Sequence, residues 1–169
     1  MAAAPLSLVA LTAAATDRFE RFVAAAQIVE HIDFNVDSSC QPASPNTEST
    51  AMGRISGSGL GTTGLGAFTI SSLDCVRAAS PNFQPPFVFS STSLKLTTSN
   101  GDEIVATYSG TALLDPVTFL LVLNGTFEFT GGTGKYKKVR GSGSLVGAED
   151  ISGFPAARGF ATLTGSIAR

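Results

Sequence analysis

Apolar and polar residues alternate along most of this chain, and short turn-forming segments interrupt the alternation at regular intervals. The first clear run covers positions 27–36, and the side chains on its apolar face are Ile28, Glu30, Ile32, Phe34 and Val36. A period of two residues is typical of a β-strand with one buried face. We therefore predict a strand here.

Seven more strands are predicted downstream from the same alternation. They cover residues 51–60, 65–75, 87–98, 103–114, 118–130, 139–148 and 159–168. Between two of them stands Asn100-Gly101, a strong hairpin signal because both residues tolerate positive φ. Short strands at even spacing fit a barrel or a sandwich. We predict an all-β fold, a closed eight-stranded antiparallel barrel, because closure removes the exposed edges that promote aggregation.

One short helix is predicted before the first strand. Thr16 or Asp17 could cap it, and its apolar face at helical spacing would consist of Phe19, Phe22, Val23 and Ala26. Such a helix would either lie across one end of the barrel or pack on its outside.

Residues 1–15 are apolar and end in small side chains, as the core of an export signal does, but they lack its charged start. A flexible tail or a cloning remnant are the alternatives. The segment is shorter than the about 20 residues that cross a bilayer, and no other stretch is long enough, so no membrane span is expected. Residues 16–169 are then one barrel domain, and secreted, periplasmic and cytoplasmic locations all remain open.

The composition agrees with a folded β domain and excludes one class of partner. Of the 169 residues, 43% are hydrophobic and only 14% are charged, so a substantial core can form. The 18 glycines suit tight turns between strands. The 11 basic and 13 acidic side chains leave a net charge of -2, which gives no electrostatic basis for binding a nucleic acid.

The sequence lacks motifs for metal or cofactor chemistry. One histidine and two cysteines are too few for a metal site. The GxGxxG match at residues 59–64 joins two predicted strands, whereas a dinucleotide site needs this pattern to open a helix. Residues 131–135 resemble a phosphate-binding loop, but Tyr136 stands where a Ser or Thr would hold magnesium. We expect no cofactor and no metal.

The two cysteines have two interpretations. Cys40 and Cys75 could close a disulfide across about 35 residues in an oxidising compartment. Alternatively, they could be two small, buried hydrophobic side chains.

Three polar side chains on predicted strands are the candidate catalytic residues. Glu30 shares an apolar face, where burial would raise its pKa into the range useful for acid–base catalysis. The hydroxyl of Tyr108, among small and apolar neighbours, could orient a carbonyl or a phenol. Arg54 lies on a strand of small residues with space for an anionic group. The alternatives are a neutral, hydrogen-bonded Glu30 or an outward-facing strand, a structural core tyrosine, and no role for Arg54.

A glycine-rich hairpin and the last strand carry the one family resemblance in the chain. The residues are GTFEFTGGTGKYKKVRGSGSL (125–145) and GFATLTGSI (159–167). Together they resemble the allene oxide cyclase and dirigent-type barrels and their small bacterial relatives, over about residues 100–167. The resemblance implies an eight-stranded barrel with an apolar cavity, frequent homo-oligomers, and cofactor-free cyclisation or coupling of a reactive small molecule. It assigns no catalytic residue in this chain.

Three functions compete on this fold. The favoured one is a cofactor-independent cyclase or isomerase that folds a hydrophobic polyene, polyketide or lipid-derived molecule inside the barrel. The others are a non-catalytic barrel that binds a small molecule and a secreted structural module with a filled lumen. The side chains expected to contact the ligand are Ile32, Phe34, Ile104, Leu121 and Phe127.

Overall fold

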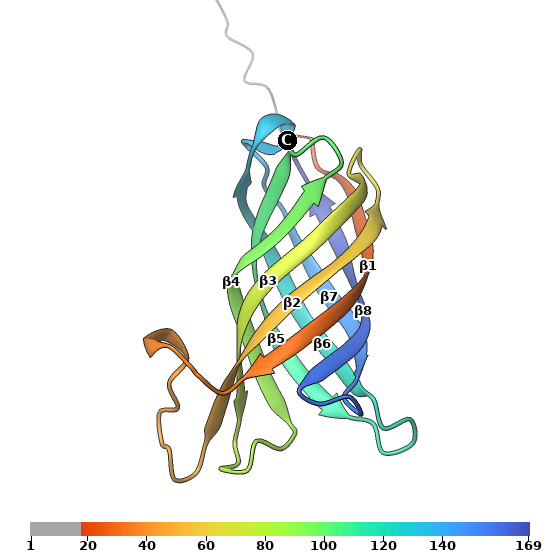
Figure 1. Cartoon of the computed structure of the whole chain (residues 1–169). Helices are drawn as coiled ribbons and strands as arrows, with labels where there is room; N and C mark the ends of the chain where they lie inside the picture. Colours follow the sequence, from red (N-terminus) through yellow and green to blue (C-terminus); the bar gives the residue numbers. More distant parts are fainter. Residues whose placement is uncertain (1–17) are drawn as a thin grey trace, which may run out of the picture.

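The protein is a closed barrel of eight antiparallel strands, in a computed structural model that describes residues 18–169 (Figure 1). Each strand pairs with the next in sequence, and the last pairs back with the first. The strands are β1 (Glu20–Asp33), β2 (Ser49–Gly61), β3 (Gly66–Ala78), β4 (Phe87–Thr98), β5 (Glu103–Leu114), β6 (Leu121–Gly132), β7 (Ser142–Asp150) and β8 (Ala156–Ile167). The predicted all-β barrel is therefore confirmed.

Two short 3-10 turns, η1 (Ser38–Cys40) and η2 (Gly134–Tyr136), are the helical elements within residues 18–169. Neither provides a helix with the length and apolar character to cross a membrane.

The predicted N-terminal helix is wrong over residues 19–26, because β1 already begins at Glu20. Phe22, Ala24 and Ala26 are buried in alternation, so this segment extends the period of two upstream from Ile28. An alanine-rich run fits a helix or a strand, and pairing with both β8 and β2 supplies backbone hydrogen bonds that favour the strand. The predicted cap, Thr16 or Asp17, and the apolar segment 1–15 lie outside the described residues.

Several strand limits also differ from prediction, most of them by two or three residues. β1 ends at Asp33, so Phe34 and Val36 belong to the loop that follows it. β6 begins at Leu121 rather than near residue 118, because Phe119 has a φ of 59° and lies in the preceding turn, 70% exposed.

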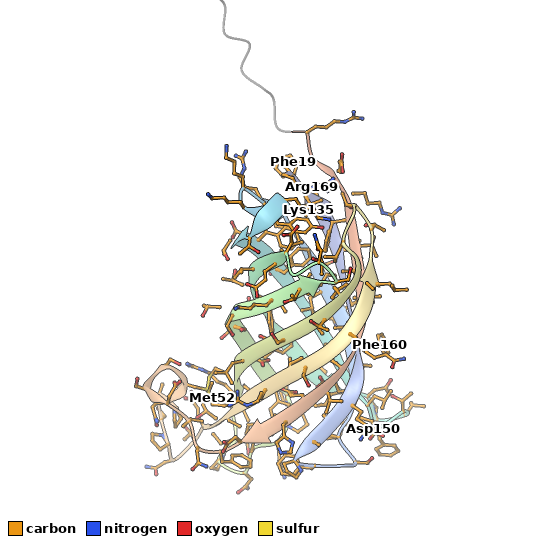
Figure 2. The ribbon with its side chains drawn as sticks, turned by 45° about the horizontal axis from the view of Figure 1, so that its top comes forward. Phe19, Met52, Lys135, Asp150, Phe160 and Arg169 are labelled. Atoms are coloured by element: carbon orange, nitrogen blue, oxygen red, sulfur yellow. A yellow bond between two sulfur atoms is a disulfide. The ribbon has the colours of Figure 1, made fainter. Side chains whose placement is uncertain are left out.

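The barrel has one packed end, which we call the closed end, where β1 begins and β8 ends. The largest completely buried side chains at this end are Phe22, Leu96, Ile104, Tyr136 and Ile167. Figure 1 shows η2 and the C-terminus here, and Figure 2 shows Phe19, Lys135 and Arg169 on its exterior. Side chains of residues 18–169 therefore pack together and fill this half of the lumen.

The opposite end, which we call the open end, carries the longer loops. They are residues 34–48, 79–86, 115–120 and 151–155. In Figure 1 they extend below the barrel, and in Figure 2 Met52 and Asp150 lie toward this end.

The loop 34–48 is attached to the outside of the barrel by a disulfide between Cys40 and Cys75. This is one of the two interpretations that the sequence left open. The disulfide lies in a small second core with Met52, against which Val36 and Leu73 pack. The loop is therefore held against the outer face of β2 and β3.

Removing this disulfide should lower the stability of the barrel. The bond spans 35 positions, and a crosslink over a loop of that length restricts the unfolded chain enough to contribute about 3 to 4 kcal/mol. We expect the double variant Cys40→Ala/Cys75→Ala to lose about this free energy of unfolding in urea titrations. A midpoint and slope equal to those of the unmodified protein would show that the crosslink does not stabilise the fold.

Candidate active site

The open half of the barrel contains an internal cavity of about 160 Å³. It extends to the loops of the open end, where Phe83, Pro85 and Phe154 line it. Within residues 18–169 the lining is apolar except for Glu30, Asp74, Tyr108 and Glu149. A cavity of about 150 Å³ is large enough to bind benzene, so this one suits a ligand with a single ring whose remainder extends toward the mouth.

The four polar groups of the cavity come from the four odd-numbered strands. Glu30 lies on β1, Asp74 on β3, Tyr108 on β5 and Glu149 on β7. All four are buried, with exposed fractions between 3% and 8%. Inward-facing side chains of alternate strands meet in layers inside a closed barrel, which is how residues so distant in sequence become neighbours. We call Glu30, Asp74 and Glu149 the carboxyl cluster.

Glycines on the intervening strands make room for the carboxyl cluster. Gly53 lies on β2, between the strands of Glu30 and Asp74, and a Cβ there would clash with Oε1 of Glu30 and lie 3.1 Å from Oδ1 of Asp74. Gly159 lies on β8, between the strands of Glu30 and Glu149, and a Cβ there would be 2.8 Å from Cγ of Glu149. The missing side chains allow carboxyl groups to approach across a strand.

Burial raises the pKa of every member of the carboxyl cluster. The pKa of Glu30 is raised well above its usual value, first by burial and then by repulsion from Glu149 and Asp74. Burial also raises the pKa of Glu149, while its hydrogen bond with Glu30 lowers it. Glu30 is therefore the protonated partner and donates to Glu149.

Asp74 is placed to change its charge near neutral pH. Burial raises its pKa to about 7, although a hydrogen bond with Tyr108 works in the opposite direction. A carboxyl group with a pKa near the operating pH can act as either acid or base. The cluster thus combines a proton donor, Glu30, with a group that can accept a proton, Asp74.

A chain of hydroxyl groups supports Asp74 from the far side of the cavity. The Tyr108 hydroxyl lies 3.1 Å from Oγ of Ser72 and also contacts the Asp74 carboxyl. Oγ of Ser72 is 2.8 Å from Oγ of Ser91, which donates to the carbonyl of Leu73 at 2.7 Å. The single hydroxyl proton of Tyr108 therefore has two acceptors, Ser72 and Asp74, and an ionised Asp74 is the stronger of the two.

Irregular strand pairing positions these hydroxyls. The β3–β4 register shifts between Ser71 and Cys75, and the β4–β5 register shifts between Ser91 and Leu94. Where the ladder is interrupted, side chains replace backbone partners: Ser93 Oγ accepts from the Leu73 amide at 3.1 Å. Such bulges redirect side chains, and they often lie beside functional sites.

The structure brings two of the three predicted catalytic residues into the cavity. Glu30 and Tyr108 face inward, and Asp74 connects them. The prediction for Arg54 is wrong because its neighbours Gly53 and Ile55 take the inward positions. Arg54 is exposed on the outer face of β2, opposite His31 in the pairing with β1.

The predicted ligand contacts divide between the two ends. Ile32 and Leu121 line the cavity. Ile104 and Phe127 do not, because they are packed into the core toward the closed end, where the lumen is filled. Phe34 does not line the cavity either, because it lies beyond the end of β1 and is 53% exposed. Its ring is 5.1 Å from that of Phe83, which does line the cavity.

Asp74 and Glu149 were missed at the sequence level, although a signal existed for Asp74. It shares an alternating face with Phe68 and Ile70, which places an acidic residue among apolar ones just as Glu30 is placed. Glu149 follows the predicted end of the seventh strand, and only the true end at Asp150 makes it an inward-facing residue.

No match to the chain was found among known protein families, curated proteins or solved structures. Within residues 18–169, no group of His, Cys, Asp or Glu side chains has the arrangement of a metal site.

Proposed function

We propose that the protein is a cofactor-independent cyclase or isomerase that binds a hydrophobic small molecule in the open half of the barrel. The observation that carries the proposal is the carboxyl cluster, with its raised pKa values, in an otherwise apolar cavity. Binding alone needs only the apolar lining, and buried carboxyl groups destabilise a fold. Acid–base chemistry gives a reason for their presence.

The reaction begins with the protonated carboxyl of Glu30. It donates its proton to a carbonyl oxygen or an alkene of the substrate, and the positive charge that develops is stabilised by ionised Asp74 or Glu149. In a cyclisation an internal alkene supplies the electron pair that forms the ring bond. The new double bond takes its electron pair from the C–H bond that breaks in the last step. Asp74 accepts the proton released in the last step. Substrate and product are isomers, so no oxidant or cofactor is consumed.

Confinement of the substrate in the cavity is the second contribution to the rate acceleration. A flexible chain loses its freedom on entering a preformed apolar cavity, so its reacting ends are held together before the chemical step. The proton gained by Asp74 returns to Glu30 within the cluster, since Glu30 adjoins both other carboxyls. The resemblance to allene oxide cyclase and dirigent-type barrels, and the homo-oligomer that it implies, belong to this proposal.

Citronellal provides a direct test, because acid converts this ten-carbon aldehyde to the cyclic isomer isopulegol. We expect the protein to form isopulegol, detected by gas chromatography, and Glu30→Gln and Asp74→Asn each to slow the reaction by roughly 100-fold, a usual value for general acid–base groups. Glu128→Gln is the matched control, since this carboxylate is exposed on the outer face of β6. Equal rates in the protein, both cavity variants and buffer would refute the proposal.

A further inference from the structure

Two carboxyl oxygens in the cavity have no hydrogen-bond partner. They are Oε1 of Glu30 and Oδ1 of Asp74, and both residues are more than nine-tenths buried. Both oxygens lie against the same point, the space above Gly53 that a Cβ would occupy. Buried polar atoms are nearly always satisfied, so a pair of unpartnered acceptors beside a cavity indicates a position for a donor.

The electrostatic balance of the cavity indicates the charge of that donor. Three carboxyl groups line the cavity, and among residues 18–169 no lysine, arginine or histidine does. Buried carboxylates are normally paired with a positive group, because an unpaired charge is costly away from water. The described residues thus supply acceptors and negative charge in the cavity, and none of those that line it supplies a cation.

We propose that this cavity binds hydrophobic amines as ammonium ions, with the nitrogen between Glu30 and Asp74 and the hydrocarbon part against the apolar wall. The inference rests on the proposed function for its catalytic meaning, because a bound ammonium then occupies the place of the positive charge that develops during cyclisation. An ammonium group has several N–H donors and can satisfy both unpartnered oxygens at once. The cavity volume favours an amine carrying one ring.

Binding should be linked to proton release. The titratable groups that face the nitrogen position are Glu30 from β1, Asp74 from β3, Tyr108 from β5 and Glu149 from β7. Among the described residues, β2 presents Gly53 there, and β4, β6 and β8 line the cavity with apolar side chains alone. Near neutral pH part of the cluster is protonated, and an arriving cation favours its ionised form. Affinity should therefore rise with pH, by up to roughly tenfold per pH unit where one proton is released, until the amine itself loses its charge.

Calorimetry with three ligands of one shape tests the inference. Benzylamine is cationic, benzyl alcohol is neutral and benzoate is anionic, while all three carry the same ring. We expect benzylamine to bind at least roughly tenfold more tightly than benzyl alcohol, which corresponds to one strong charged contact, and benzoate not to bind. Titrations in buffers of different ionisation enthalpy should show protons released to the solvent.

Variants separate the charged contact from simple filling of the cavity. Glu30→Gln and Asp74→Asn keep the shape of the side chains and should each remove most of the preference for benzylamine, whereas Glu128→Gln on the outer surface should retain it. Gly53→Ala would place a methyl group where the two oxygens converge and should weaken benzylamine more than benzyl alcohol. Circular dichroism confirms that each variant is folded before it is titrated.

The outcomes for binding and catalysis are separable. Equal affinity for benzylamine and benzyl alcohol, or a preference that survives in both cavity variants, would overturn the ammonium site and show that the ring alone or water fills the cavity. Preferential binding of benzylamine without conversion of citronellal would support the ammonium site and refute the cyclase. Conversion of citronellal without preference for the amine would support the cyclase and refute the ammonium site.

Discussion

Replacing Asp74 with asparagine is expected to stabilise the protein above neutral pH and to leave its stability nearly unchanged in acid. Burial moves the pKa of this carboxyl from 3.8 to about 7 on folding. Since one pKa unit corresponds to about 1.4 kcal/mol, ionised Asp74 destabilises the fold by about 4 kcal/mol relative to its protonated form. Asparagine resembles the protonated form at every pH.

The direction of this change in stability follows because the folded state holds the proton of Asp74 more tightly than the unfolded state does. A carboxyl whose pKa is raised by folding favours the folded state while it is protonated, and this contribution is complete below the unfolded pKa of 3.8. It is lost as the pH rises through the folded pKa of about 7. Stability of the unmodified protein should therefore fall between these values, while Asp74→Asn should fall less because Asp74 no longer titrates.

Urea titrations at a series of pH values measure this difference directly. The two proteins should have similar free energies of unfolding near pH 4, and the variant should be more stable by about 4 kcal/mol near pH 9. Glu128→Gln is the control, because an exposed carboxylate gives only a small change at either pH. A variant less stable than the unmodified protein near pH 9 would mean that ionised Asp74 is well solvated or paired in the fold.

A substitution that stabilises the fold and also slows catalysis would connect the two roles of the cavity. Residues held in unfavourable environments are expected at functional sites, because chemistry needs the perturbed groups that folding alone would eliminate. Asp74→Asn is expected to act in both directions at once, raising the free energy of unfolding and slowing the conversion of citronellal. A purely structural carboxyl would not produce this pair of effects.

The barrel could be predicted from sequence because its signals are local. The limits of β4 and β5 agree with those expected, since the Asn100-Gly101 turn determines where one strand ends and the next begins. Residues 19–26 were assigned incorrectly because an alanine-rich segment is compatible with both the helical and the strand period. Its pairing with β2 and β8 favours the strand. Pairing between segments distant in sequence is not visible in the pattern of a single strand.

The site could be predicted only in part, because it depends on which face of each strand turns inward. The residues two positions before and after Glu30 and Tyr108, on the same strand face, are apolar or small. The inward direction of these two side chains could therefore be inferred. Arg54 alternates with small residues, and such a strand does not reveal its inward face. Asp74 lies in a stretch where pairing with β4 is irregular, and the convergence of three carboxyls follows from closure of the barrel.

Replacing Phe22 with alanine should cost the barrel about 3 to 5 kcal/mol of stability, the usual value for a phenylalanine removed from a core. Its side chain is completely buried at the closed end, with its ring 5.0 Å from that of Phe129 and 6.1 Å from that of Phe127. The surrounding strands are paired on both sides around the closed barrel, so they cannot move inward to fill the space. The vacated volume therefore remains as a cavity.

Phe160→Ala is the matched control, because Phe160 projects from the outer face of β8 and is 52% exposed (Figure 2). Thermal unfolding should show a fall in Tm of roughly 10 °C for Phe22→Ala and little change for the control. The initial rate of citronellal conversion, measured well below the Tm, should be the same in both variants, since the closed end supplies no group to the carboxyl cluster. Equal losses of stability in the two variants would show that the aromatic packing at the closed end does not hold the barrel together. A slower reaction in Phe22→Ala would show that this packing also positions the carboxyls, and that the two ends are not independent.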